Sequence, residues 1–378
     1  DIGAFVTFNF LAIDDPQQET HILRQTDANA YARLNIDNVH EFFVRGRTSY
    51  LDWNSGDSFS PAAPGRGLDQ GDDWVEPTLD RGYYKFDFQR YMAAYHDKTI
   101  DWNIQAKGGR QLVHWVNGLV LSEVIDGGTF TASLGNLTLD AVAGRTRDSI
   151  TDIDSSRPGF GNDTKRDFYG GMLSYQIVPE HRPFVYGLVQ KDNNDEDFDP
   201  DPLKRLREES PGLPELPTSF HYDSFYVGFG SQGNFGDNIL YAVEMVYQGG
   251  RTLSNSFDPE TGTSIDQVFD DIDAFAADIR LDYLFQDANN TRLTVELLLA
   301  TGDDDRLHTT NAFGGNQPGT NDNAFNAFGL INTGLAFSPN VSTLIMLRGG
   351  ASTMPLRSVQ LFQRLQVGTN LCMLRLAA

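Results

Sequence analysis

The feature that most constrains this chain is a period-two alternation of apolar and polar residues, repeated in segments of about ten residues. In residues 100–107 the even positions are apolar, and the odd positions are Asp, Asn, Gln and Lys. In residues 291–300 the odd positions Leu293, Val295 and Leu297 oppose Arg292 and Glu296. Successive side chains of a strand point to opposite faces, so each segment predicts a strand with one apolar face. A strand of a soluble sandwich gives the same local pattern, and the arrangement of the segments must therefore decide between the two.

We predict about sixteen strands whose connections alternate strictly between short and long. The short connections lie near 37–38, 93–98, 134–136, 178–182, 232–236, 286–290 and 338–340, and most carry the Asn, Asp, Gly or Pro of tight turns. The long connections are 51–79, 111–126, 147–165, 191–218, 249–272 and 302–324. The predicted strands are 2–11, 27–36, 39–50, 80–92, 99–110, 127–134, 136–146, 166–177, 182–190, 219–231, 237–248, 273–285, 291–301, 325–337, 340–350 and 358–371.

This alternation is typical of an all-β fold, a single closed antiparallel transmembrane β-barrel that occupies residues 1–378 as one domain. A strand that crosses a bilayer at a tilt needs about 9–11 residues, which the segments supply. The short turns would be periplasmic and the long acidic loops extracellular, in the outer membrane of a Gram-negative-type bacterium. Both chain ends would then lie at the periplasmic side, with the first strand paired to the last.

Two segments leave the secondary structure open. The connection 111–126 contains Trp115 and several aliphatic residues, so it is either an extra strand pair, giving eighteen strands, or a constriction folded into the lumen. The charged stretch 204–209 suits one short helix within a long loop. The chain ends in Leu-Arg-Leu-Ala-Ala rather than on an aromatic residue, so the last strand is either atypical or incomplete.

Composition agrees with a barrel that crosses with strands. Hydrophobic residues make up 40% of the chain and no run of about 20 apolar residues occurs, so no membrane helix is expected. Only every second strand residue needs to face lipid, which keeps the overall hydropathy low. No leader precedes Asp1, so we expect the sequence to start after a cleavage site. The single cysteine, Cys372, excludes an intrachain disulfide.

The net charge of −23 is concentrated in the long connections. Acidic residues crowd 69–76, 192–201 and 303–305. One interpretation is a solvated rim; the other is binding of a divalent cation such as calcium, which prefers carboxylate oxygens. The residues lack the strict spacing of a calcium loop, and we predict no other cofactor or metal. The acidic excess also argues against a nucleic-acid partner.

Strand parity assigns many charged residues to the lumen. An Arg or Lys facing lipid costs about 2–4 kcal/mol at the bilayer midplane, so the lumen is the favourable side for them. The cross-strand charges form either a structural ladder of ion pairs or a ring that sets solute preference. The predicted lumenal residues are Arg33, Arg45, Arg47, Lys85, Lys107, Arg280, Arg292, Arg348, Arg364, Glu41, Asp87, Asp101, Glu244, Asp278, Asp282 and Glu296.

Motifs of enzymes are absent from the sequence. It contains no G-x-S-x-G, no H-E-x-x-H and no phosphate-binding loop, and the pair His221 and Asp223 falls near a predicted strand end. We therefore expect a protein that is not an enzyme. Our first hypothesis is a passive outer-membrane channel for hydrophilic solutes, since sixteen strands enclose a water-filled lumen. The alternatives are a barrel that houses a partner protein in its lumen, from an electron-transfer or secretion assembly or with periplasmic contacts, and a soluble all-β carbohydrate-binding protein.

One stretch adds a family resemblance. Gly109-Arg110-Gln111, then Trp115, then Asp126-Gly127 and then 137–141 (Leu-Thr-Leu-Asp-Ala) resemble the alginate-export family of outer-membrane barrels. The resemblance implies an exporter or porin with an arginine-lined channel for anionic or saccharide solutes, and it implies that Arg110 lines the pore. Parity counted from Lys107 instead points Arg110 outward, unless Gly108-Gly109 forms a bulge.

Overall fold

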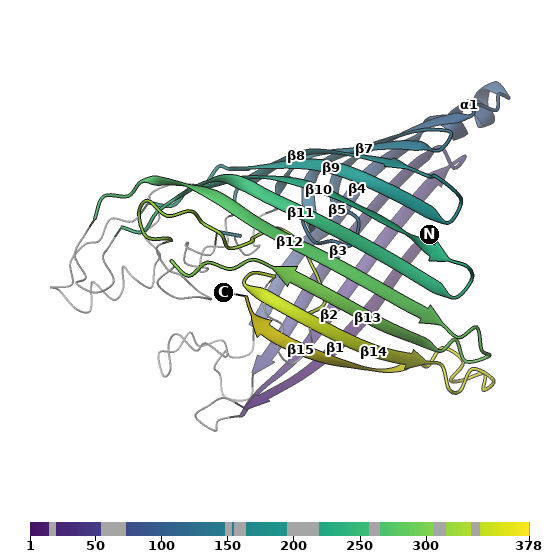
Figure 1. Ribbon diagram of the computed structural model, residues 1–378. Helices are drawn as coiled ribbons and strands as arrows, with labels where there is room; N and C mark the ends of the chain where they lie inside the picture. The colour runs from purple at the N-terminus through teal and green to yellow at the C-terminus, as the bar shows by residue number, and fades with distance from the viewer. Residues whose placement is uncertain are drawn as a thin grey trace. The chain divides into compact units, whose positions relative to one another are not determined.

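The structure, a computed structural model, describes residues 1–14, 20–53, 73–147, 153–154, 164–194, 219–256, 265–305, 315–333 and 341–377. Within these ranges the chain is all-β, with fifteen strands and one α-helix (Figure 1). It forms two compact units, Asp1–Gln111 and Leu112–Ala378. The elements are β1 (Ile2–Asp14), β2 (Thr20–Ile36), β3 (His40–Trp53), β4 (Asp73–Asp87), α1 (Phe88–His96), β5 (Trp102–His114), β6 (Ser122–Leu134), β7 (Leu137–Thr146), β8 (Arg166–Tyr175), β9 (His181–Asp192), β10 (Tyr222–Phe235), β11 (Ile239–Leu253), β12 (Phe269–Leu284), β13 (Arg292–Ala300), β14 (Leu344–Thr353) and β15 (Val367–Leu376).

In the first unit, β1 to β5 pair antiparallel in chain order. The turn from β2 to β3 contains Asp37 and Asn38, both with positive φ, as a tight hairpin turn requires. One face of these strands carries exposed apolar residues, among them Val6, Phe8 and Leu34, with exposed fractions of 68%, 64% and 57%. The opposite face carries charged and polar residues such as Arg33 and Lys85, together with Phe5 and Leu11 of β1.

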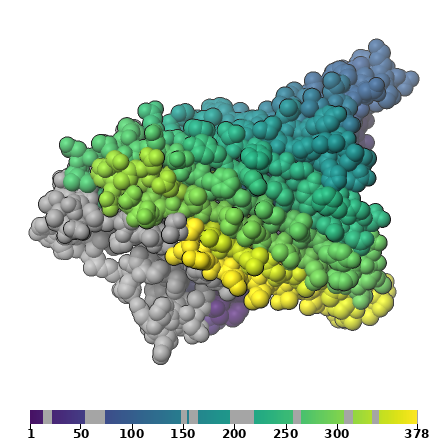
Figure 2. Space-filling view, viewed as in Figure 1, coloured from purple at the N-terminus to yellow at the C-terminus, as the bar shows by residue number. Residues whose placement is uncertain are grey.

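In the second unit, β6 to β15 also pair antiparallel in chain order. Their outer face is apolar and exposed: Val227, Leu281 and Val295 are 48%, 46% and 53% exposed. In Figure 2 these strands, coloured from teal to yellow, form a continuous surface. Their inner face holds a buried cluster that includes Tyr186, Val246 and Met346. The unit therefore has a hydrophobic exterior and a separate, partly polar interior.

The helix α1 replaces the end of a predicted strand. We expected a strand over 80–92, but β4 ends at Asp87, whose side chain accepts a hydrogen bond from the backbone N–H of Arg90. Asp is a favoured N-cap residue because it satisfies a backbone N–H of the first helical turn. The helix ends at Asp97, which adopts the left-handed conformation with φ +51°. No helix in the described part of the chain is long and apolar enough to cross a membrane.

Three further strand predictions need correction. The predicted strand 325–337 is wrong, because 325–333 form an irregular segment that packs inward, while 334–340 lie outside the described residues. The predicted strand 358–371 begins only at Val367, after a series of turns in 355–364. The predicted strands 2–11 and 27–36 are too short, since β1 extends to Asp14 and β2 begins at Thr20. The predicted helix at 204–209 lies outside the described residues.

The strand count also corrects the expected position of the chain ends. The amino group of Asp1 donates to the carbonyl of Arg33, near the short turn after β2. At the other end, the N–H of Ala377 donates to the carbonyl of Thr343, which follows a long connection. Within the described residues, β1 therefore begins at the short-turn end of its strands and β15 ends at the long-loop end of its own.

Candidate functional site

The segment 115–121, between β5 and β6, folds onto the inner face of the second unit. It forms a tight loop in which Gly118 N–H donates to the carbonyl of Trp115 at 2.7 Å, and Trp115 N–H donates to that of Leu121 at 2.9 Å. Val116 and Gly118 adopt positive φ. Trp115, Leu119 and Leu121 are all buried. Of the two alternatives for 111–126, the structure therefore shows the inward fold rather than an extra strand pair.

A second inward segment, residues 315–333, packs against the first. Phe328 pairs with Leu121 in a parallel bridge, and Ser122 N–H donates to the carbonyl of Phe328 at 2.7 Å. A Cβ atom on Gly329 would lie 2.1 Å from the carbonyl oxygen of Leu119, so only glycine fits at this crossing. The two segments thus form one layer inside the unit.

Polar contacts attach this layer to the strands. The side-chain amide of Asn117 donates to Asp278 Oδ2 at 2.8 Å, and its backbone N–H donates to Glu244 Oε2 at 3.2 Å. The other oxygen of Glu244 accepts from the Tyr186 hydroxyl at 2.6 Å. Glu244 and Asp278 are almost fully buried and are directly opposite each other in the β11–β12 register. Asn117 is therefore bound by two buried carboxyl groups that belong to neighbouring strands.

The second inward segment has its own attachment. Asn326 N–H donates to the side-chain oxygen of Gln248 at 2.8 Å, and the carbonyl of Asn326 accepts from the Tyr226 hydroxyl at 2.7 Å. Gln248 is held in turn by the Tyr222 hydroxyl at 2.7 Å. Both inward segments are thus positioned by buried polar side chains of β9 to β12.

Next to this layer, three arginines line a cavity of about 380 Å³. Arg280, Arg292 and Arg348 come from the consecutive strands β12, β13 and β14. The remaining lining residues supply small and uncharged polar groups. They are Thr294, Gly350, Ala351, Ser352, Gln366, Gly368, Thr369 and Asn370.

The carboxylates of the same strands lie beneath these arginines. Arg280, Glu296 and Arg348 form one row across the three strands, and Glu296 pairs with Arg348. Asp282 binds two guanidinium groups, Arg292 at 2.9 Å and Arg280 at 3.2 Å. The side chains of Arg280 and Arg292 are 38% and 35% exposed, whereas that of Asp282 is 7% exposed. The cavity is therefore lined by the positive ends of ion pairs whose negative ends are covered.

In the first unit the predicted lumenal residues also form a polar face with ion pairs. Arg33 binds Glu41 at 2.6 Å, Arg47 binds Asp27 at 2.8 Å, and Arg45 pairs with Asp80. Lys85 lies opposite both Glu41 and Lys107 in the register. Lys107 Nζ also lies 4.0 Å from the ring centroid of Tyr83. The predicted cross-strand charge ladder is thus present, and pore lining remains a proposal.

Four predicted positions differ from a simple lumenal wall. The β4–β5 register runs without a bulge from Asp87↔Gln105 to Gly82↔Arg110. Arg110 therefore shares the face of Trp102 and Ala106 and donates to the carbonyl of Leu79, against the role that the family resemblance implied. Asp87 caps α1, and Asp101 is exposed just before β5. Arg364 lies in the turns that precede β15.

Sequence reasoning missed the residues that hold the inward layer. Tyr186 has the inward parity of Phe184, so the alternation in β9 was a usable signal for it. Asn117 and Asn326 carry no comparable signal, because both lie in irregular segments. Their contacts are made with strands far away in the chain, 161 residues away between Asn117 and Asp278.

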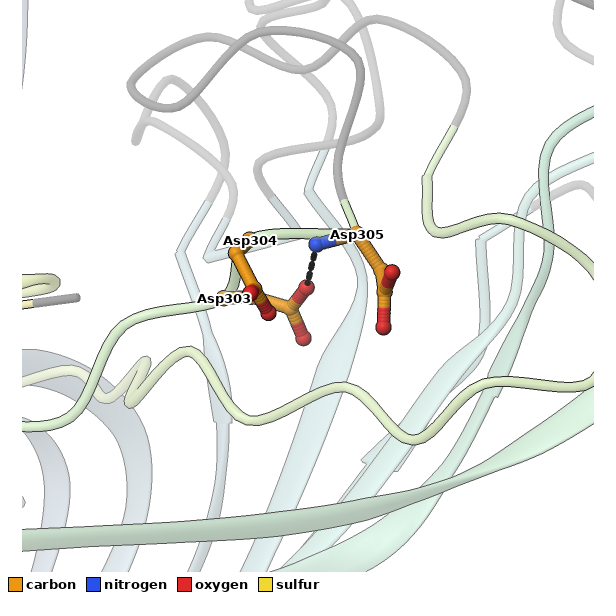
Figure 3. Close-up of side chains that lie close together, drawn as sticks. All are labelled: Asp303, Asp304 and Asp305. Atoms are coloured by element: carbon orange, nitrogen blue, oxygen red, sulfur yellow. Dashed lines mark hydrogen bonds between the residues drawn. The ribbon is translucent and has the colours of Figure 1, made fainter.

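The aspartates Asp303, Asp304 and Asp305 bring carboxylate oxygens within 4.8 Å of one another (Figure 3). Both oxygens of Asp303 already accept hydrogen bonds, Oδ1 from Asp305 N–H at 2.8 Å and Oδ2 from Asn323 N–H at 2.6 Å. Asn316 adds a further bond to Oδ2 at 2.9 Å. These contacts explain the buried Asp303 as an organiser of its loop, and binding of calcium there stays a prediction.

Comparison with solved structures finds matches at low sequence identity. OccK11 (OpdR) of Pseudomonas aeruginosa has a TM-score of 0.47 at 10% identity, covering 100% of this chain and 78% of that chain. OccAB4 of Acinetobacter baumannii has a TM-score of 0.42 at 11% identity, covering 95% and 77%. OmpT, an outer membrane protein of Vibrio cholerae, has a TM-score of 0.34 at 12% identity, covering 79% and 85%. No protein-family model matches the chain, and no curated protein matches it either.

Proposed function

We propose that this protein is a passive channel of the outer membrane for hydrophilic solutes, with a preference for anions. Its strands close into a barrel, because an open sheet edge in hydrocarbon leaves backbone N–H and C=O groups unpaired at several kcal/mol each. The exposed apolar face of the strands supports lipid contact, since large apolar surfaces are rare on soluble monomers. The protein acts without catalysis.

The observation that carries the anion preference is the cavity lined by Arg280, Arg292 and Arg348. Positive side chains at a constriction lower the electrostatic barrier for anions, and the attraction grows as the local dielectric falls. The side chains of Arg280 and Arg292 are partly exposed, whereas their shared partner Asp282 is covered, so the positive groups are the ones that a solute in the cavity would meet. The acidic loops oppose entry of anions, but exposed charges are screened over about 8 Å at physiological salt.

The inward layer favours a channel over a barrel that houses a partner protein. In the second unit, residues 115–121 and 315–333 of the chain itself cover the inner side of β9 to β12. A lumenal partner would have to displace both segments and break the contacts of Asn117 and Asn326. A chain that narrows its own interior suits the passage of small solutes instead.

The test is ion selectivity in a planar bilayer. Reversal potentials in a salt gradient are measured for the native protein and for the double variant Arg280→Gln/Arg292→Gln, which leaves the buried Arg348–Glu296 pair intact. We expect weak anion selectivity in the native protein and a shift toward cations in the variant. Arg357→Gln is the matched control, because Arg357 contacts Ala288 and Asn290 in the turns outside the cavity. Cation selectivity of the native protein that persists at high salt contradicts the proposal.

A further inference from the structure

The helix α1 carries an aromatic stripe that its own strands cover only in part: Phe88, Tyr91 and Met92 are partly buried, and Tyr95 is 47% exposed. Phe88, Tyr91, Met92 and Tyr95 follow the i, i+3, i+4, i+7 spacing that places side chains on one face of a helix. A nine-residue helix is too short to be stable by itself in water. Contacts with the neighbouring strands cover part of this face, and covering the rest would stabilise the helix further.

The stripe continues the exposed apolar face of the neighbouring strands. Phe42 contacts Tyr84 with ring centroids 4.9 Å apart, and His40 links Tyr84 to Phe86. Phe86 in turn contacts the rings of Phe88 and Tyr91 on the helix. These ring contacts form a continuous series from the outer face of β3 and β4 onto α1. The helix follows the C-terminal end of β4 (Figure 1).

Polar contacts fix the orientation of the helix on its strands. Tyr95 Oη donates to Asp37 Oδ2 at 2.6 Å, in the turn between β2 and β3. Gln89 Nε2 donates to the carbonyl of Ile100 at 2.7 Å, and Phe88 stacks on Trp102 at 5.1 Å between centroids. These contacts hold the stripe on the same side as the outer strand face.

We propose that α1 lies in the headgroup region of the bilayer, with its stripe of Phe88, Tyr91, Met92 and Tyr95 against phospholipid. Tyr and Trp favour this zone because one part of the ring system is apolar and the other forms hydrogen bonds. The strands of the first unit are anchored at their turn end by this interfacial helix. The inference rests on the proposed location in a membrane, since its main support is continuity with the lipid-facing strand surface.

The test uses single cysteines in the full-length protein with Cys372 replaced by serine, reconstituted in phosphatidylcholine vesicles. A fluorescent label is attached at Met92→Cys, on the stripe, or at Ala93→Cys, the adjacent residue on the opposite side of the helix. We expect nitroxide lipids labelled at the headgroup to quench the Met92 label strongly and lipids labelled deep in the acyl chain to quench it weakly. A water-soluble quencher should act mainly on the Ala93 label.

A third label at Leu281→Cys separates the two proposals. Leu281 lies on the exposed apolar face of β12 and should be quenched by deep nitroxide lipids. If Leu281 contacts lipid and Met92 responds only to the aqueous quencher, the interfacial helix is wrong and the membrane location stands. If neither label responds to lipid, the membrane location itself is wrong. Disulfide formation between Met92→Cys chains without lipid quenching would show that a second copy covers the stripe.

Discussion

At the scale of single residues, several buried carboxyl groups on the inner face of the second unit have identified polar partners. Asn117 binds Glu244 and Asp278, while Glu296 pairs with Arg348. A buried charge is tolerated only when it is paired and hydrogen-bonded, so these partners are more sensitive to change than the exposed ion pairs of the rim.

Replacing Asn117 by alanine should loosen the loop 115–121. The change removes a hydrogen bond to the buried Asp278 carboxylate and should cost about 1–3 kcal/mol of stability. Single-channel conductance should rise as the loop leaves the inner face. Asn117→Asp should raise it further, because a third carboxylate would be placed beside Glu244 and Asp278. Asn238→Ala, which removes one side-chain hydrogen bond to Leu284 in a short turn, is the control. Equal conductance in all four proteins would count against a role of the loop in the pore.

Replacing Arg348 by methionine should destabilise the protein more than replacing both members of its ion pair. Loss of Arg348 removes the ion-pair partner of the buried Glu296 and leaves Arg280 as its cationic neighbour in the row, and breaking a buried pair typically costs about 3–5 kcal/mol. In Arg348→Met/Glu296→Leu both charges are gone, so most of this loss should be recovered. Guanidinium unfolding followed by tryptophan fluorescence measures both variants. A double variant as unstable as the single one would disprove the coupling.

At the scale of elements, the short turns are ordered by side chains that bind their own backbone. In the turn between β12 and β13, Asp287 accepts from Thr291 N–H at 2.7 Å and from the Thr291 hydroxyl at 2.6 Å. The hydroxyl and backbone bonds of Thr291 lower the pKa of Asp287, because they favour the charged carboxylate. This turn should therefore depend on pH.

Asp287→Asn should lower the melting temperature at neutral pH. A carboxyl group whose folded pKa is lowered stabilises the fold above its unfolded pKa, and this contribution disappears as the pH falls through the folded value. The difference in melting temperature between native protein and variant should therefore shrink below about pH 4, the ordinary range of aspartate. Circular dichroism at a series of pH values measures it. A difference that grows on acidification would have the wrong sign for this model.

At the scale of the whole molecule, the two faces of the strands have different chemistry in both units. Exposed apolar side chains such as Phe8 and Val295 cover one face, and ion-paired residues such as Arg47 and Glu296 lie on the other. In water the apolar face would drive association between molecules. In a bilayer the same face contacts lipid acyl chains and is not exposed to water. The whole protein should therefore depend on detergent or lipid for solubility.

Spin labels should report this alternation one residue at a time. In the Cys372→Ser background, labels at Leu281 and Val295 should be relaxed by oxygen dissolved in the bilayer. Labels at Arg280 and Thr294, their neighbours on the opposite face, should be relaxed by an aqueous nickel complex. A response that does not alternate between adjacent positions would contradict the assignment of the faces.

The sequence alone determined most of the strands and which of their residues share a face. Alternation is a local property, because successive side chains of a strand point to opposite faces of the sheet. Arg280 and Leu281 were therefore placed correctly on opposite faces of β12 before any contact was known. The N-cap Asp87 is also a local signal, although the apolar pattern of 80–92 concealed the helix that it starts.

The tertiary structure alone decided how the interior is filled. Residues 325–333 have an apolar content that suits a strand, yet Phe325 and Phe328 are buried together within an irregular segment. Their position depends on Leu121 and Tyr226, which lie about one hundred residues or more away in the chain. The sharing of Asp282 by two arginines depends likewise on the register of β12 and β13. Such contacts arise from packing between distant segments, and no periodicity within one segment encodes them.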